Sequence, residues 1–115
     1  MLEGYLELAA AHLERFHGRL VKSTGDGILA TFDGPARAIH CACSIRDAVA
    51  GLGLQVRVGL HTGEVELMGD DVGGIAIHIC ARVATLARPD EVLASSALPP
   101  LVVGSDISFT DRGDH

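Results

Sequence analysis

The chain has 115 residues, of which 48% are hydrophobic and 3% aromatic, so we expect a single domain over residues 1–115 with an aliphatic core. The formal net charge is −6 and there is no basic run, which argues against a nucleic-acid partner. No apolar run approaches the roughly 18 residues of a membrane span, and no signal peptide follows Met1, so we expect a cytoplasmic protein without a membrane segment.

The cysteines are also consistent with the cytoplasm. Cys41, Cys43 and Cys80 are an odd number and lie within apolar helical patterns. This usage is typical of small core residues in a reducing environment, and the spacing of the first two is not that of a zinc site.

The first predicted element is an amphipathic helix over residues 2–17. Glutamates occupy the face opposite its apolar stripe, and Gly18 stands where a C′ glycine would end the helix. The apolar stripe consists of Leu2, Leu6, Ala9, Leu13 and Phe16.

A hairpin is predicted next. Two apolar runs flank Gly25-Asp26-Gly27, and Asp-Gly between such runs indicates a tight turn, because both central positions need a positive φ. We expect paired strands at 20–23 and 28–32, with Asp26 at the tip. A carboxylate there is either a turn former or a ligand for a hard cation, and this stretch alone favours the turn.

A second helix is predicted to open at Asp33-Gly34-Pro35 and to end at Gly51 and Gly53. Its expected buried stripe is Ala38, Ala42, Ile45 and Val49, with Cys41 beside them. Its expected solvent face is Arg37, His40, Ser44 and Asp47. His40 is therefore interpreted as a surface residue rather than a ligand.

The second half alternates between strands and helices. We expect a strand at 55–61, a turn at Gly63, a return strand at 64–68, and a polar loop at 69–71. A third helix at about 75–87 would turn Ile75, Ile79 and Leu86 to the core. A strand at 92–94, a short helix at 96–103 and a strand at 107–110 complete the chain, and the whole order predicts an α+β fold.

Three blocks, in this order, carry a resemblance to a known family. They are Lys22-Ser23-Thr24-Gly25-Asp26-Gly27, then residues 57–64 (Arg-Val-Gly-Leu-His-Thr-Gly-Glu), then residues 71–83 from Asp71 to Val83. Together they resemble the class III adenylate and guanylate cyclase catalytic domain over about residues 2–113. The resemblance implies a ferredoxin-like cyclase homology fold, here lacking its first central strand, since only Met1 precedes the first helix.

The resemblance also implies a chemistry, the attack of the ribose hydroxyl of ATP on its α-phosphorus to give cyclic AMP and pyrophosphate. Lys22 and Asp71 match the pair that reads adenine, and Asp26 matches the second metal-binding aspartate. Arg82 matches the arginine that stabilises the phosphates, a role suited to a guanidinium. His78 stands where most members carry an asparagine that orients the ribose.

The implied metal is Mg²⁺ or Mn²⁺, and its site is incomplete in these residues. The family's first metal-binding aspartate lies on the missing strand, and upstream of Lys22 the carboxylates are Glu3, Glu7 and Glu14, on a helix. We therefore expect an adenylate cyclase-family domain in cyclic nucleotide signalling that is inactive or very weak alone. The family site is shared between two chains, so a homodimer or a second cyclase chain is the expected partner.

Two other interpretations remain open. The chain could be a non-catalytic pseudo-cyclase that dimerises, or that lends Lys22, Asp71 and Arg82 to a complete partner. It could also be an unrelated ferredoxin-like ligand-binding domain, which would make the three blocks a coincidence. The open apolar groove expected from a missing central strand predicts self-association, strand exchange or a rearranged sheet.

Overall fold

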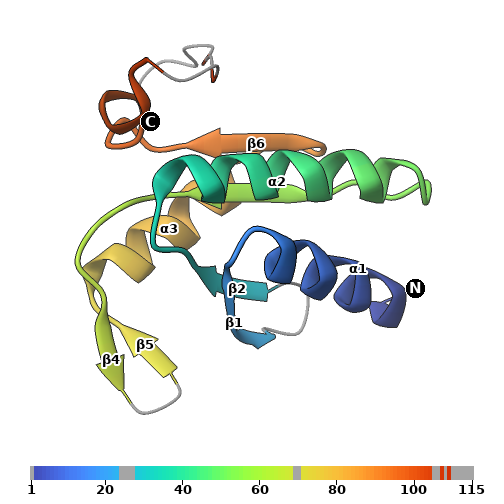
Figure 1. Cartoon of the computed structure of the whole chain (residues 1–115), viewed down its shortest axis with the longest axis horizontal. Coiled ribbons are helices and arrows are strands. Elements are labelled where there is room, and N and C mark those ends of the chain that lie inside the picture. Colours follow the sequence, from blue (N-terminus) through green and yellow to red (C-terminus); the bar gives the residue numbers. More distant parts are fainter. Residues whose placement is uncertain (1, 24–27, 69–70, 105–106, 108, 110–115) are drawn as a thin grey trace.

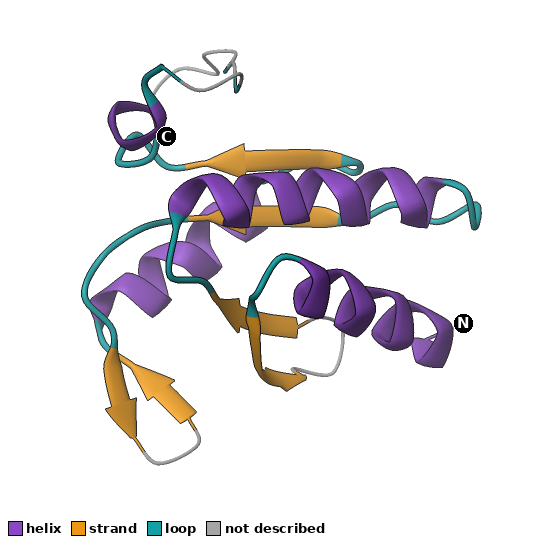
Figure 2. Ribbon diagram, viewed as in Figure 1, coloured by secondary structure: helices purple, strands orange, loops and turns teal. Residues whose placement is uncertain are grey.

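The structure, a computed structural model, describes residues 2–23, 28–68, 71–104, 107 and 109, and the fold is α+β as predicted (Figures 1 and 2). The described strands form three separate pairs, β1–β2, β3–β6 and β4–β5. The elements are α1 (Leu2–Arg15), β1 (Arg19–Ser23), β2 (Ile28–Thr31), α2 (Pro35–Ala50), β3 (Arg57–Leu60), β4 (Glu66–Met68), β5 (Asp71–Gly73), α3 (Ile75–Leu86), β6 (Glu91–Ala94) and a 3₁₀ turn, η1 (Pro99–Val102).

The first helix forms where predicted, but its end does not use Gly18 as expected. His17 takes the left-handed conformation, with φ 60°, and the Gly18 N–H donates to the Leu13 carbonyl at 2.8 Å. This bond closes a Schellman motif with His17, not glycine, at C′. Gly18 is small for another reason, since a Cβ there would lie 2.5 Å from Cε2 of Phe32.

The predicted hairpin is present. β1 and β2 pair antiparallel, with Leu20 opposite Ala30 and Ser23 opposite Ile28, and a bulge interrupts the register between Leu20 and Lys22. The turn expected at Gly25-Asp26-Gly27 lies outside the described residues.

The core lies between α1, α2 and β2. Gly34 is the N-cap of α2 and Pro35 its first residue, as predicted, and Gly53 ends the turn after it with φ 77°. The predicted stripe is confirmed at Ala42, Ile45 and Val49 and at the neighbouring Cys41, whereas Ala38 is only half-buried. Ile39 is buried as well, which was not predicted. The main buried cluster is Ala9, Leu13, Cys41, Ile45 and Val49.

One residue of the expected solvent face of α2 is not solvated. Ser44 is half-buried, and its hydroxyl lies 2.9 Å from Nδ1 of His12 on α1. The prediction that Ser44 faces solvent was therefore wrong, because α1 packs against α2 at this position (Figure 1). His40 is exposed, as predicted.

The second hairpin was predicted wrongly. β3 does not pair with the residues after Gly63; it pairs in parallel with β6, with Val58 opposite Val92. β4 instead pairs antiparallel with β5, so Asp71 is a strand residue rather than part of a polar loop. A parallel pair needs a long crossover, and α3 supplies it here by covering one face of β3–β6 while α2 covers the other (Figure 1).

The third helix has the predicted span but buries the opposite residues. Ile75 is 76% exposed, and Ile79 and Leu86 are also exposed, while Ala76 is buried. The reason is a close approach between backbones, since a Cβ on Gly59 of β3 would lie 2.6 Å from Cα of Ala84. Only small side chains fit between two elements this close, so Ile75 and Ile79 face outward.

The last elements are short. The helix expected at 96–103 is reduced to the 3₁₀ turn η1, which starts at its two prolines. Of the strand expected at 107–110, only Ile107 and Phe109 are described, and neither is assigned to a strand. Over the described part of the chain, each helix is too short or too polar to cross a bilayer.

Candidate functional site

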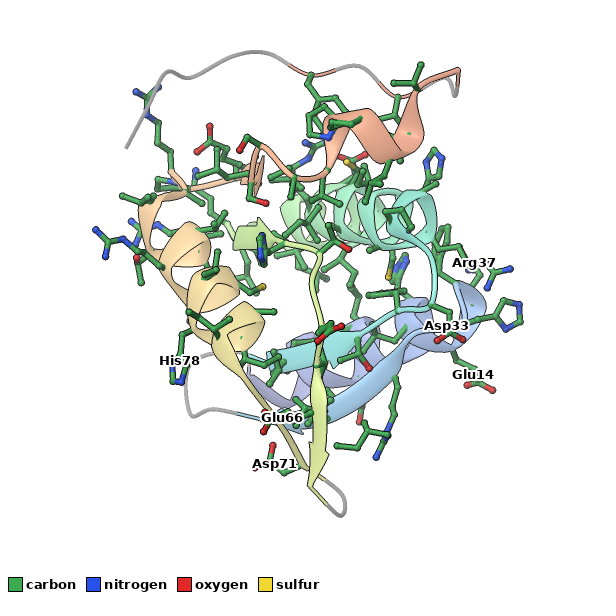
Figure 3. The ribbon with its side chains drawn as sticks, turned by 90° about the vertical axis from the view of Figure 1, so that its left-hand side faces the viewer. Glu14, Asp33, Arg37, Glu66, Asp71 and His78 are labelled. Carbon is green, nitrogen blue, oxygen red and sulfur yellow. The ribbon has the colours of Figure 1, made fainter. Side chains whose placement is uncertain are left out.

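Three elements that carry predicted site residues lie together. β5, which begins at Asp71, contacts both β1 and α3, so the strand of Lys22 and the helix of His78 and Arg82 flank it. Figure 3 shows Asp71 on the hairpin and His78 on the neighbouring side of α3. The backbone thus brings residues from distant parts of the sequence to one side of the molecule.

Asp71 is the best defined of these residues. Its side chain is half-buried, and Oδ1 accepts a hydrogen bond of 2.7 Å from the N–H of Val72. This bond fixes the carboxylate at the start of β5. Glu66 lies on the adjacent strand β4, so the hairpin presents two carboxylates on this side (Figure 3).

His78 and Arg82 are both exposed on α3. Residues four apart on a helix share a face, so the imidazole and the guanidinium project from the same side. The Arg82 carbonyl accepts a hydrogen bond from the Thr85 hydroxyl at 2.7 Å, which holds the backbone of that turn. An exposed guanidinium on a helix face can reach an anionic group outside this chain.

The other two predicted residues are less completely described. Lys22 lies on β1 opposite Leu29, directly after the bulge, and its side chain is outside the described part. Asp26 lies wholly outside the described residues. Its predicted role as a metal ligand therefore stays a prediction.

The described residues alone do not fit a metal ion. Within the described ranges, no three His, Cys, Asp or Glu side chains are close enough together to hold one. Any Mg²⁺ or Mn²⁺ would need Asp26 and further ligands, so we assign no chemical step to a metal.

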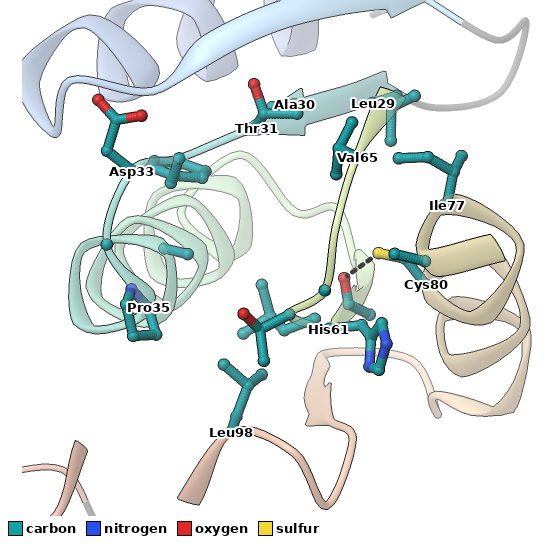
Figure 4. A pocket seen from close by; sticks show the side chains of 18 residues that line it. Leu29, Ala30, Thr31, Asp33, Pro35, His61, Val65, Ile77, Cys80 and Leu98 are labelled. Carbon is teal, nitrogen blue, oxygen red and sulfur yellow. Dashed lines mark hydrogen bonds between the residues drawn. The ribbon is translucent and has the colours of Figure 1, made fainter. Parts of the chain in front are cut away.

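A second feature is a cavity of about 170 Å³ between β2 and β3 (Figure 4). It is lined mainly by apolar residues, including Leu29 of β2, Phe32 directly after β2, Leu60 of β3 and Ile77 of α3. Its polar lining includes His61, whose Nδ1 lies 2.7 Å from the Ser95 hydroxyl, and Cys80, whose thiol donates to the Gly59 carbonyl at 3.4 Å.

These polar pairs were not found from the sequence. His61 and Ser95 meet because each directly follows its strand, and Leu60 is opposite Ala94 in the parallel β3–β6 pair. Since the sequence had assigned β3 to a different partner strand, nothing in it pointed to this contact.

Comparisons with known proteins agree with the fold. An adenylate/guanylate cyclase/hydrolase from Silicibacter pomeroyi superposes with a TM-score of 0.85 at 29% sequence identity, over 93% of this chain and 69% of that one. The catalytic core of a rhodopsin-guanylyl cyclase with converted specificity, in complex with ATPαS, shares the fold, with a TM-score of 0.79 at 20% identity, over 90% of this chain and 66% of that one.

A similarity in sequence points the same way. "Putative adenylate cyclase 3" of Rhizobium meliloti (strain 1021) is 33% identical over 107 residues, which is 85% of this chain. The chain spans only 18% of that relative's length. No model of a protein family matches the chain.

Proposed function

Because this chain belongs to the adenylate/guanylate cyclase catalytic-domain family, we propose that it binds ATP and takes part in its conversion to cyclic AMP and pyrophosphate. The observation that carries the proposal is the position of β5, which lies in contact with both β1 and α3. This arrangement supports a site in which Lys22, Asp71 and the exposed residues of α3 act on one nucleotide, in one chain or across a dimer.

Lys22 and Asp71 would select the base. The ammonium donates to a ring nitrogen of adenine and the carboxylate accepts from its exocyclic amine. Guanine presents the reverse pattern and would leave a buried donor or acceptor unpaired, at a cost of about 1–3 kcal/mol. The bond from the Val72 N–H holds the Asp71 carboxylate in place for this contact.

Arg82 would act on the triphosphate. Negative charge shifts onto the phosphate oxygens as pyrophosphate leaves, and a guanidinium can donate to two oxygens at once. His78, on the same face of α3, would donate one hydrogen bond to the ribose.

The 115 residues carry one of the two metal-binding aspartates that the family resemblance implies, Asp26. We therefore expect weak turnover from this polypeptide alone and higher turnover when a second cyclase chain supplies both carboxylates. The shared site would then take base and phosphate contacts from this chain.

The test is a mixing assay with ATP and Mn²⁺, measuring cyclic AMP. The partner is a cyclase chain with both metal aspartates but with its own base-reading lysine and its arginine replaced by alanine. We expect much higher activity in the mixture than in either chain alone. Absence of activity in a mixture that forms a heterodimer would contradict the proposal.

Two variants of this chain sharpen the assay. Arg82→Ala should lower kcat in the mixture by about 100-fold or more, as the loss of one transition-state donor typically does. Arg37→Ala is the matched control, because Arg37 is also exposed but lies on the opposite side of the molecule (Figure 3), and it should leave kcat unchanged.

Lys22→Glu should lower the ratio of kcat/KM for ATP over that for GTP by about tenfold or more.

A further inference from the structure

The helix α3 starts from a backbone conformation that only glycine adopts readily. Its N-cap, Gly74, has φ 111° and ψ 168°, a region that residues with a side chain avoid. The usual N-caps are serine, threonine, aspartate and asparagine, whose side-chain oxygens accept hydrogen bonds from the first N–H groups of the helix. From Gly74 to Leu86, all of which the structure describes, no acidic residue stands in the first turn, and the N-cap has no side chain to offer.

The first N–H groups of α3 therefore need an acceptor from elsewhere in the chain. Those of Ile75 and Ala76 have no acceptor within the helix, as at the start of any helix. The Ile77 N–H turns back to the Gly74 carbonyl at 3.2 Å. The same end of the helix carries the positive end of its dipole, so a carboxylate nearby would stabilise it.

Glu66 of β4 brings a carboxylate to this end of α3. In the antiparallel β4–β5 pair, Glu66 is opposite Gly73, the residue before the N-cap. A Cβ built on Gly74 would lie 3.8 Å from Cγ of Glu66 and 3.7 Å from its backbone nitrogen. Because the Glu66 side chain is exposed, its last bonds have room to rotate, and such a rotation reaches the first turn of α3.

Two neighbouring carboxylates fit this role less well. Asp71 Oδ1 already accepts a hydrogen bond of 2.7 Å from the Val72 N–H. Glu64 comes nearest to the Gly74 Cβ position with its backbone carbonyl oxygen, at 3.6 Å. Glu66 is thus the carboxylate whose side chain itself lies against the N-cap.

We propose that Glu66 is a positioning residue, which caps the N-terminus of α3 from β4 and so fixes α3 against the hairpin that carries Asp71. The cap acts on the site through the helix, because His78 and Arg82 lie on α3 and β5 contacts it. The spacing between the base contact and the phosphate contact then depends on this link. The positioning role rests on the proposed function, whereas the cap itself does not.

The cap is tested on this chain alone by amide hydrogen exchange at residues 75–77. Glu66→Ala should speed exchange there by about 2- to 30-fold, which corresponds to the loss of an N-cap side chain. Glu66→Gln should speed it less, because an amide oxygen still accepts a hydrogen bond. Glu14→Ala is the control, since Glu14 is also exposed but lies on the opposite side of the molecule (Figure 3), and it should leave exchange at 75–77 unchanged.

The positioning role is tested in the mixing assay with ATP and Mn²⁺. Glu66→Ala should lower kcat by about 3- to 10-fold with little change in KM for ATP, because a displaced Arg82 loses most in the transition state. Glu66→Gln should recover part of this loss, and Glu14→Ala should have the kcat of the unaltered chain. A role in stability alone would lower the melting temperature and leave kcat per folded molecule unchanged.

Each arm can overturn its part of the inference. Equal exchange at 75–77 in Glu66→Ala and in the unaltered chain would exclude the cap. Faster exchange with an unchanged kcat would exclude the positioning role. If the unaltered chain formed a heterodimer but no cyclic AMP, the proposed function and the positioning role would both be wrong, while the exchange measurement would still decide the cap.

Discussion

The helices α2 and α3 bury opposite kinds of residue. α2 turns isoleucine, valine and cysteine into the core with α1 and β2, and Val49 is fully buried. α3 is the more hydrophobic sequence, yet it buries only Ala76 and exposes Ile75, Ile79 and Leu86. Hydrophobic periodicity predicted the first correctly and the second wrongly.

The difference lies in the surface each helix meets. α2 packs on side chains, which leave room for branched residues. α3 meets β3 at Gly59, where Ala84 lies against the strand backbone. The distance between two elements, rather than the hydrophobicity of either face, therefore decides which side of a helix is buried.

The largest effect is expected from a side chain placed in the close contact between Gly59 of β3 and Ala84 of α3. Gly59→Ala places a methyl group inside van der Waals range of the Ala84 backbone, which cannot move without shifting α3. We expect a loss of at least about 3 kcal/mol in the free energy of unfolding, at the upper end for overpacking, measured by urea denaturation. Gly34→Ala is the control, since a Cβ there meets nothing within 4 Å, and it should cost about 1 kcal/mol or less. Equal losses in the two variants would refute the close-packing account.

The next effect tests the conventional core of α2. Ile45→Ala removes a buried side chain from the cluster between α1 and α2 and should lower the free energy of unfolding by about 2–4 kcal/mol. The same denaturation experiment checks it. A loss below about 1 kcal/mol would mean that the cluster is loosely packed or absent in solution.

The smallest effect comes from the same substitution on the other helix. Ile75→Ala changes a side chain that is 76% exposed, so the free energy of unfolding should change by no more than about 0.5 kcal/mol. If Ile75→Ala cost as much as Ile45→Ala, α3 would bury the face that periodicity predicted.

Most elements could be predicted because their signals are local. Gly34 and Pro35 at the start of α2, Gly53 after its end, and the apolar runs of β1 and β2 each act within a few residues. The pairing of β3 with β6 could not be predicted. The two parallel strands are joined by a crossover of about thirty residues, and the sequence of β3 itself does not indicate which strand follows that crossover. The close contact at Gly59 could not be predicted either, because a glycine in a sequence does not indicate which part of the chain packs against it.

The candidate site divides in the same way. His78 and Arg82 could be placed on one helix face from their spacing alone. The contacts of β5 with β1 and α3 depend on its pairing with β4. This pairing was not predicted, because Asp71 was assigned to a polar loop. An open apolar groove was expected, and the cavity between β2 and β3 has a mainly apolar lining, but the hydrogen bond from the Cys80 thiol to the Gly59 carbonyl was not expected.

The corner between α1 and β1 places unequal demands on two adjacent positions. The left-handed backbone is at His17, where glycine or asparagine would relieve conformational strain. The steric demand is at Gly18, where the ring of Phe32 leaves no room for a side chain. Glycine or asparagine should therefore be tolerated at position 17 and β-branched residues disfavoured, while any side chain at position 18 requires the Phe32 ring to move. Two adjacent positions at one corner are thus restricted for different physical reasons, one by the backbone and one by a neighbouring side chain.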